Sequence, residues 1–309
     1  MFWDPPRLSA CLRDPGEFRL TTSKTNNLDL VMTLLVRDEE DIIAANIEYH
    51  RAQGVDFFIV MDNLSTDGTT EILKSYQKKG FLHYILQKRD DYSQGKWVTT
   101  MAQMASVRYG AKWVINNDAD EFWWPLEGSS LRDSLLSVPE EYNVVEAQRH
   151  NFVPVTDSSK VFYDEMIYRQ TESVNPLEGP LPPKVCHRGL ANVVVTQGNH
   201  EVVGFEPVSV CRGRVEILHF PFRHLQQYQR KIIMGGEAYQ RNTELSSEVG
   251  RTWRKLHETY TRQGQLPEAI RLQIKDSVQI KRELRRGLIV EDKRLSNYMA
   301  RIRLSERRP

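Results

Sequence analysis

The chain has 309 residues, 40% of them hydrophobic and 27% charged, which is enough apolar material to bury one large core with a helical appendage. Its three cysteines lack metal-binding spacing, and their odd number argues against a disulfide framework and for a reducing compartment. No apolar run approaches the roughly 18 to 20 residues that a membrane-spanning helix needs, and residues 1–6 lack a signal-peptide core, so we expect a cytoplasmic protein.

Regular structure is expected to begin after an irregular leader, residues 1–28. Residues 30–36 form a continuous apolar run that is typical of a buried strand, and a group of acidic residues follows it directly. Asp38 is expected to cap a helix that ends at Gly54 and buries a stripe of residues at helical spacing, Ile42, Ile43 and Ile47. The pattern therefore predicts a strand followed by a helix.

A second strand and helix follow at once. Residues 57–61 are apolar and lead into a polar loop, residues 62–69, and the next helix, residues 70–79, is closed by Gly80. Alternating strands and helices with short polar joints predict a doubly wound α/β sheet, whose ligands bind beyond the carboxyl ends of the strands.

A further acidic cluster, Asp118-Ala119-Asp120-Glu121, follows the apolar strand predicted at residues 113–117. Asp118 and Asp120 are two residues apart, so on an extended backbone both side chains would leave one face and reach one hard divalent cation. A metal held there could grip a diphosphate. The alternative is a solvated acidic turn, which a single D-x-D motif would favour on its own.

The acidic residues at the ends of these strands are expected to converge on one crevice, where like charges need a metal or a hydrogen-bonding ligand. Neither G-x-G-x-x-G nor G-x-x-x-x-G-K-[ST] follows the first strand, which argues against dinucleotide-binding dehydrogenases and P-loop enzymes. Metal bridging is therefore the expected way to bind phosphate.

Four ordered motifs within about residues 29–235 carry a resemblance to a known family. They are Val36-Arg37-Asp38-Glu39-Glu40, Glu48-Tyr49-His50 with Gly54-Val55, Asp62-Asn63-Leu64-Ser65-Thr66-Asp67-Gly68-Thr69, and Asp118-Ala119-Asp120-Glu121-Phe122. The chain resembles the family 2 glycosyltransferases, and more closely their bacterial branch related to the family 92 enzymes, in which a later histidine element precedes Arg and Lys. That element is His219-Phe220-Pro221-Phe222-Arg223 with Lys231. The resemblance implies a GT-A-like fold, a doubly wound, mostly parallel mixed sheet flanked by helices.

The resemblance also implies a donor site. Asp62 matches the acid that recognises the nucleobase, and Ser65 and Asp67 match the loop beside it. Lys96 stands where the family has a basic or polar residue near ribose or phosphate. From the residues alone, Asp67 also suits an ordinary Asp-Gly turn and Lys96 an ordinary first-turn lysine. The other expected contacts of the nucleotide sugar are Arg37, Glu39, Asp118, Arg223 and Lys231.

The same resemblance implies a metal site made of Asp118, Asp120 and His219. Asp120 would ligate Mn²⁺ or Mg²⁺ directly, Asp118 would contact the ribose and the metal shell, and His219 would complete that shell. An imidazole ligand tilts the preference toward Mn²⁺. A buried, hydrogen-bonded histidine is the alternative for His219, and it is the expected role of His50 on the first helix.

The catalytic base lacks a clear motif, because no Glu-Asp pair follows the D-x-D sequence. A carboxylate would deprotonate the acceptor hydroxyl if the reaction inverts the anomeric configuration, as the resemblance implies. The acids proposed for this role are Glu201, Asp164 and Glu237.

The charge of the chain is unevenly distributed. Residues 251–309 contain sixteen Lys and Arg against seven Asp and Glu, a net of +9, although the whole chain carries only +1. We expect a catalytic domain at residues 29–235 and a basic extension at residues 236–309, with helices at about residues 248–262, 268–285 and 292–303.

Two explanations of the basic extension are open. We expect it to pack on the acidic catalytic domain; the alternative is a peripheral contact of its densest patch, residues 281–286, with the inner face of an anionic membrane. Nucleic-acid binding is not expected, because the patch lacks interleaved aromatic residues.

The sequence therefore predicts a metal-dependent glycosyltransferase. It would move a sugar from a nucleotide diphosphate sugar, with UDP favoured by the resemblance, to a saccharide or other hydroxyl acceptor. Two other classes remain open: a phosphohydrolase that uses Asp118 as nucleophile, and a non-catalytic sugar-binding protein on the same fold. The phosphohydrolase would be expected to carry its D-x-D after the first strand, whereas two strands precede it here.

Overall fold

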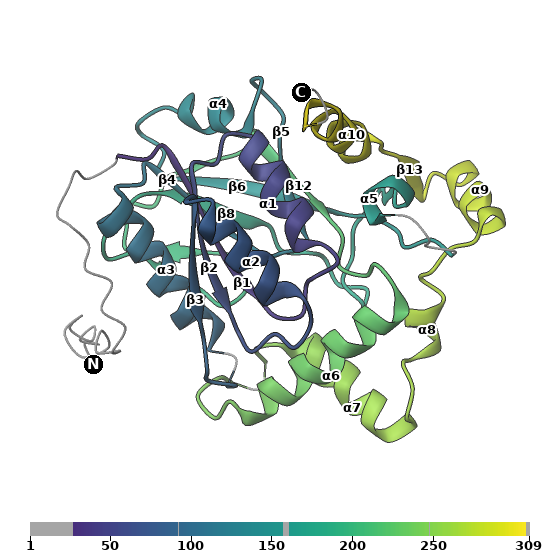
Figure 1. The fold of residues 1–309 in the computed structure, drawn as a ribbon. Helices are drawn as coiled ribbons and strands as arrows, with labels where there is room; N and C mark the ends of the chain where they lie inside the picture. The colour runs from purple at the N-terminus through teal and green to yellow at the C-terminus, as the bar shows by residue number, and fades with distance from the viewer. Residues whose placement is uncertain (1–26, 92, 157–160, 247, 307–309) are drawn as a thin grey trace.

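The computed structural model describes residues 27–91, 93–156, 161–246 and 248–306. The predicted leader, residues 1–28, lies almost entirely outside these ranges. A central mixed β-sheet with helices packed on it forms the body of the molecule, and the C-terminal helices extend along one side (Figure 1).

One half of the sheet is parallel. β1 (Leu30–Val36) lies between β2 (Phe57–Asp62) and β4 (Trp113–Asn117) and pairs in parallel with both, and β2 pairs in parallel with β3 (Leu82–Leu86). The strands predicted at residues 30–36, 57–61 and 113–117 are thus confirmed. Because these strands run in one direction, their carboxyl ends meet at one edge of the sheet.

The other half is mixed. β8 (Lys184–Arg188) is antiparallel to both β4 and β6 (Val144–Asn151), β6 is parallel to β12 (Val215–His219), and β12 is antiparallel to β5 (Glu121–Pro125). The order is β3-β2-β1-β4-β8-β6-β12-β5, with β11 (Val210–Cys211) also beside β6. The predicted mostly parallel mixed sheet of a GT-A-like α/β fold is confirmed.

Apolar side chains leave β1 alternately toward two cores, as a strand buried on both faces requires. Leu30, Met32 and Leu34 pack in the core beneath α1 (Ile43–Ala52) and α2 (Thr69–Lys78). Val31 packs in a second core with α3 (Gln94–Tyr109) on the opposite face. This division between two faces is what makes the sheet doubly wound.

The first helix begins later than predicted. α1 starts at Ile43 rather than at Asp38, because Asp38 has a φ of 53° and its Oδ1 accepts a hydrogen bond from the backbone N–H of Thr66, at 2.6 Å. Asp38 therefore ties the β1–α1 loop to the β2–α2 loop. The predicted stop at Gly54 is confirmed, since this glycine follows the helix with a φ of 93°.

The C-terminal region differs most from the prediction. The longest helix of the described residues, α6 (Leu225–Arg241), runs through residue 235, where the boundary of the catalytic domain was expected. The helix predicted at residues 248–262 is α7 (Arg251–Gln263), and the one at residues 292–303 is α10 (Arg294–Glu306). The one predicted at residues 268–285 is two helices, α8 (Glu268–Arg271) and α9 (Ser277–Arg285).

The break between α8 and α9 has a structural cause. Lys275 forms a β-bridge with Val155, and its N–H donates to the carbonyl of Pro154. The backbone of Lys275 is therefore committed to the catalytic body, and Asp276 caps α9 immediately afterwards. The shorter elements are α4 (Leu131–Leu136), α5 (Phe162–Glu165), β7 (Tyr168–Gln170), β9 (Val194–Val195), β10 (Val202–Val203) and β13 (Ile289–Glu291). No helix in the described ranges combines the length and apolar character that crossing a bilayer requires.

Candidate active site

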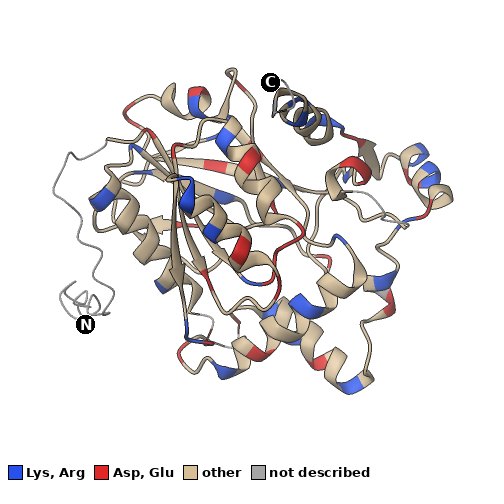
Figure 2. Ribbon diagram, viewed as in Figure 1, with Lys and Arg blue, Asp and Glu red and all other residues tan. Residues whose placement is uncertain are grey.

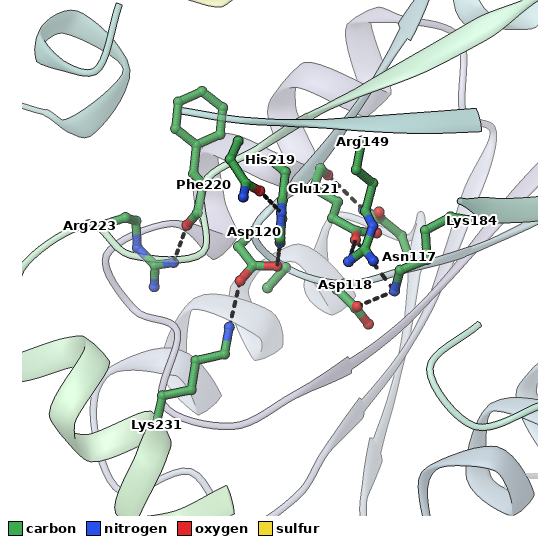
Figure 3. Close-up of polar contacts among 12 residues, drawn as sticks. Asn117, Asp118, Asp120, Glu121, Arg149, Lys184, His219, Phe220, Arg223 and Lys231 are labelled. Atoms are coloured by element: carbon green, nitrogen blue, oxygen red, sulfur yellow. Dashed lines mark hydrogen bonds and ion pairs between the residues drawn. The ribbon is translucent and has the colours of Figure 1, made fainter. Parts of the chain in front are cut away.

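The D-x-D acids lie in a tight turn and not on an extended strand. β4 ends at Asn117 and β5 begins at Glu121, and the N–H of Glu121 donates to the carbonyl of Asp118. The prediction that Asp118 and Asp120 leave one face of a strand is therefore wrong, because the chain reverses between them. Figure 3 shows the two carboxylates turned toward different partners.

Asp118 faces the mixed half of the sheet. Its Oδ2 lies 2.5 Å from Nζ of Lys184 on β8, and its Oδ1 accepts a hydrogen bond from Asn199, at 3.2 Å. The side chain of Lys184 is only 2% exposed, whereas that of Asp118 is 31% exposed. Asp118 is therefore accessible to a ligand, and Lys184 supports it from behind.

Asp120 faces α6 and β12. Its Oδ2 lies 2.5 Å from Nζ of Lys231, and its Oδ1 lies 3.7 Å from Nε2 of His219. Burial alone would raise the pKa of Asp120, but the positive charge of Lys231 holds it well below its ordinary value. Asp120 is therefore an anion with one oxygen paired to a cation and the other directed at an imidazole.

The sheet register fixes the orientation of His219. Its backbone pairs with Glu121 on β5 and with Asn151 on β6, and its Nδ1 lies 2.7 Å from Oδ1 of Asn151. Burial lowers the pKa of His219 well below its ordinary value, so the ring is neutral. A carboxamide oxygen can only accept, so Nδ1 carries the proton and Nε2 offers a lone pair toward Asp120.

Arg223 joins the loop after β1 to the loop before α6. Its guanidinium contacts both oxygens of Asp41, at 2.6 and 2.9 Å, and Oε2 of Glu39, at 2.6 Å. The side chain of Arg223 is 1% exposed, so it positions these acids and does not reach a ligand directly. Lys231, whose side chain is 29% exposed, lies 3.9 Å from the other oxygen of Glu39. Lys231 is thus the accessible cation of this group.

The predicted base-recognition loop is held by its own polar side chains. Asp62 is fully buried and accepts hydrogen bonds from the N–H of Ser65 and from the hydroxyls of Thr70 and Tyr84. Ser65 Oγ accepts from the N–H of Asp38. These contacts position the β2–α2 loop relative to the loop after β1.

Three other predicted contacts are occupied by neighbouring groups. The carboxylate of Asp67 accepts from the N–H groups of Glu40 and Thr69, at 3.1 and 2.9 Å. Arg37 pairs with Asp90 at 2.6 Å, and Lys96 on the exposed start of α3 pairs with Glu244. In this structure, the anionic neighbour of Lys96 is therefore Glu244.

Of the three acids proposed as the base, one is close in the chain to a residue that contacts the D-x-D turn. Glu201 is two residues from Asn199, which donates to Asp118. Asp164 is instead paired with both terminal nitrogens of Arg303 on α10, at 3.0 Å, which makes it an anchor for that helix. Glu237 is an exposed residue of α6 that pairs with Arg241 one turn later, at 3.7 Å. In this structure, Asp164 and Glu237 are thus each paired with an arginine.

Sequence reasoning missed a buried charged group behind the turn. Glu121 is fully buried without a hydrogen bond to either carboxylate oxygen, and its Oε1 lies 3.4 Å from Lys184 Nζ and 3.6 Å from an Arg149 nitrogen. Burial raises the pKa of Glu121 to about 7, although Lys184 opposes the shift. Arg149 and Lys184 come from strands with no local motif, so only the strand order brings them here.

The arrangement fits a divalent metal in part. In the described residues, no three His, Cys, Asp or Glu side chains converge as a ready metal cluster. Asp120 Oδ1 and His219 Nε2 nevertheless approach each other with no hydrogen bond between them, as two ligands of one ion would. Asp118 is turned toward Lys184, so the predicted three-residue set is reduced to two residues.

A family comparison decides the class of protein. Residues 32–279 match the model of glycosyltransferase family 92. The chain belongs to this family. The predicted nucleotide-sugar-dependent glycosyltransferase is thereby confirmed as the class of enzyme, and the matched range includes Asp62, Asp118 and His219.

Solved structures are similar only at a distance. S. aureus TarS, residues 1–349, is 14% identical, with 91% of each chain covered and a TM-score of 0.42. The same protein in complex with UDP-GlcNAc is 13% identical over 91% of this chain and 92% of that one, with a TM-score of 0.42. The complex of TarS with UDP is 11% identical over 76% of this chain and 72% of that one, with a TM-score of 0.41. No curated protein sequence matches the chain.

Proposed function

We propose that this family 92 enzyme transfers a sugar from a UDP-sugar to an acceptor hydroxyl, with inversion, and that Asp120 and His219 hold a divalent metal, Mn²⁺ in preference to Mg²⁺. The observation that carries the metal is the approach of Asp120 Oδ1 to Nε2 of His219, at 3.7 Å. Uridine and inversion rest on the family resemblance. When bound, the ion would act as a Lewis acid that neutralises the leaving diphosphate.

The residues around the ion have separable roles in this proposal. Asn151 keeps the proton of His219 on Nδ1, which leaves Nε2 free. Lys231 neutralises part of the charge of Asp120 and is exposed enough to turn toward a phosphate oxygen. Arg223 holds Glu39 and Asp41 in place and so keeps the loop after β1 against the site.

Asp118 is the proposed contact to the ribose. It is 31% exposed and is held by Lys184 and Asn199. Glu201, in the loop that carries Asn199, is the proposed acceptor of the proton from the acceptor hydroxyl. A saccharide or another hydroxyl compound would serve as acceptor.

Calorimetry with Mn²⁺ and UDP tests the proposal. Asp120→Asn should abolish Mn²⁺-dependent UDP binding, and His219→Ala should weaken it by about 10- to 100-fold. Glu140→Gln, at an exposed acid, is the control and should bind like the wild type. Unchanged Mn²⁺-dependent binding in Asp120→Asn would overturn the metal assignment.

A turnover assay separates the remaining alternatives. Incubation with UDP-sugars should release UDP, and Glu201→Gln should slow the transfer to an acceptor more than it weakens donor binding. Phosphate release from simple esters without turnover of any sugar nucleotide would favour a phosphohydrolase. Binding of sugar nucleotides without any release of UDP would favour a non-catalytic protein.

A further inference from the structure

Helix α9 has two unlike faces. Ile280, which is 5% exposed, and Leu284 pack against Val153 and Ile289 in a small apolar cluster of the body. The outer face carries Val278, Lys281, Arg282 and Arg285, at the i, i+3, i+4 and i+7 positions of one helical stripe, and Arg286 follows at the end of the helix. All five outer residues are exposed, and we call them the α9 basic face.

The four cations of the α9 basic face have no anionic partner in the part of the chain that the structure describes. None of Lys281, Arg282, Arg285 and Arg286 forms an ion pair with any described residue, and the acids closest in sequence are engaged elsewhere. Glu283 pairs with Lys275 at 2.9 Å, and Asp276 caps the helix through the N–H of Gln279. The extension thus packs on the catalytic domain, as expected, through the inner face of α9, but the cations of the α9 basic face take no part in that packing.

The neighbouring helix α10 shows the contrast. Arg294 pairs with Asp292 and Glu216, and Arg303 pairs with Asp164, so α10 does use its cations to bind the acidic body. The basic charge of the C-terminal region is thus divided between a paired helix and an unpaired one. Figure 2 shows Lys and Arg gathered on α9 at the edge of the molecule.

The helix is fixed firmly enough to present this face. Its first turn has a capping box between Asp276 and Gln279, and the preceding Lys275 is hydrogen-bonded through its backbone to Pro154 and Thr156. After the helix, β13 pairs with β7. These contacts lie on the inner side, so the outer side chains can be changed without removing any of them.

We propose that the α9 basic face docks on the anionic surface of a lipid membrane. Four like charges within two helical turns repel one another, and their attraction to an anionic surface offsets that repulsion. Each Lys or Arg near an anionic bilayer adds roughly a five-fold factor to the affinity, so four together give several hundred-fold. The face also holds an apolar residue among its cations, Val278, which is 71% exposed, and Leu288 just beyond it is 45% exposed.

Apolar side chains among cations suit the boundary between lipid headgroups and acyl chains. A single-stranded nucleic acid would instead call for aromatic stacking residues, and the α9 basic face has none. The inference is independent of the transfer chemistry, because it uses no residue of the proposed active site.

Vesicle co-sedimentation of the full chain tests it. The α9 variant changes Lys281, Arg282, Arg285 and Arg286 to Gln. The control variant removes the same charge from exposed cations on other helices that form no ion pair with a described residue, by changing Lys78, Arg108, Lys255 and Arg262 to Gln. The probes are phosphatidylcholine vesicles with and without phosphatidylglycerol.

The wild type and the control should bind the anionic vesicles and not the neutral ones, and the α9 variant should lose at least 100-fold in affinity. Salt should suppress the binding, because the Debye length falls from about 8 Å at physiological ionic strength to about 3 Å at 1 M. All proteins should melt at similar temperatures; if the α9 variant melts early, the double variant Lys281→Gln with Arg285→Gln replaces it and should lose at least ten-fold.

Three results would overturn the inference. They are no binding of the wild type to anionic vesicles, equal losses in the α9 and control variants, and a loss confined to a single-stranded oligonucleotide with vesicle binding unchanged. UDP release in solution should be the same in all variants, so failure of the membrane inference is distinguishable from failure of the proposed transfer reaction.

Discussion

Lys231 Nζ and His219 Nε2 approach the two different oxygens of the Asp120 carboxylate, at 2.5 and 3.7 Å. The lysine donates a hydrogen bond, whereas the neutral imidazole presents a lone pair that cannot donate one. Burial alone would lower the pKa of Lys231, but Asp120 and Glu39 raise it above its ordinary value, so the cation persists. The carboxylate is therefore charge-compensated on one side only, which leaves its other side suited to an additional cation.

Lys231→Gln separates the two sides of Asp120. The glutamine removes the cation and leaves Oδ1 and His219 in place, so Mn²⁺ alone should bind at least as tightly as in the wild type. UDP affinity in the presence of Mn²⁺ should fall by about 10- to 100-fold, because a hydrogen bond to a charged group contributes roughly 1.5 to 3 kcal/mol. Calorimetric titration measures both. If the variant fails to bind Mn²⁺ when UDP is absent, Lys231 supports the ion site itself.

Asn151 should control the metal affinity through His219. Asn151→Ala removes the acceptor that holds the proton on Nδ1, and loss of such a partner typically costs 10- to 100-fold in metal affinity. Asn151→Asp restores an acceptor at the same position and should recover most of the affinity. If both variants lose metal binding equally, Asn151 acts through its other hydrogen bond, which its amide group donates to the carbonyl of Val174.

Local patterns predicted the parallel half of the sheet well. The run at residues 30–36 coincides with β1, and the glycines Gly54 and Gly80 both end helices with positive φ. These features depend on residues close in sequence, so hydrophobic runs and turn chemistry were enough. The antiparallel strands depend on pairings between residues far apart, and periodicity could not reveal their order.

The acids of the site were predictable, but their partners were less so. The D-x-D motif located Asp118 and Asp120, yet the turn between β4 and β5 separates their side chains. Lys184 lies 66 residues from Asp118 and carries no motif; the register of β8 against β4 brings it to the turn. His50, predicted to be a satisfied histidine, accepts the N–H of Trp123 at 3.1 Å, and this prediction is confirmed.

Asp62→Asn tests the proposed base-recognition loop. Asp62 accepts from Ser65, Thr70 and Tyr84, so an amide NH₂ in place of one oxygen would face a donor and cost about 1 to 3 kcal/mol. The melting temperature should therefore fall by several degrees. Uridine binding should weaken more than pyrophosphate binding, because the distorted loop lies on the proposed nucleobase side. Equal weakening of both ligands, measured by calorimetry, would limit Asp62 to a structural role.

Tyr84→Phe is the matched control for Asp62. It removes one donor to Oδ2 and leaves the carboxylate and its contacts to Ser65 and Thr70. The melting temperature should fall less than in Asp62→Asn, and the ratio of uridine to pyrophosphate affinity should stay as in the wild type. A changed ratio would show that Tyr84 itself contributes to recognition.

The buried histidine at position 50 should make the protein acid-sensitive. Burial lowers the pKa of His50 from its ordinary 6.5 to about 3, and its Nδ1 is hydrogen-bonded to the carbonyl of Asn46. The unfolded chain takes up a proton below pH 6.5, whereas the folded chain does not until near pH 3. The stability that neutral His50 contributes is thus fully present above pH 6.5. As the pH is lowered from 6.5 toward 3, the free energy of unfolding falls by up to about 1.4 kcal/mol per pH unit.

His50→Gln should reduce this dependence. The variant should be less stable than the wild type at neutral pH, because the Trp123 N–H and Asn46 lose well-placed partners. The free energy of unfolding should be measured with urea between about pH 7.5 and about pH 4.5. Below pH 6, its slope against pH should be shallower in the variant than in the wild type by about 1.4 kcal/mol per pH unit. Above pH 7 both proteins should share one slope, since the histidine is neutral in both states there. Burial lowers the pKa of His187 to about 4, so His187 contributes equally to the pH dependence of stability in both proteins. Equal slopes below pH 6 would therefore mean that His50 is protonated in the folded state as well.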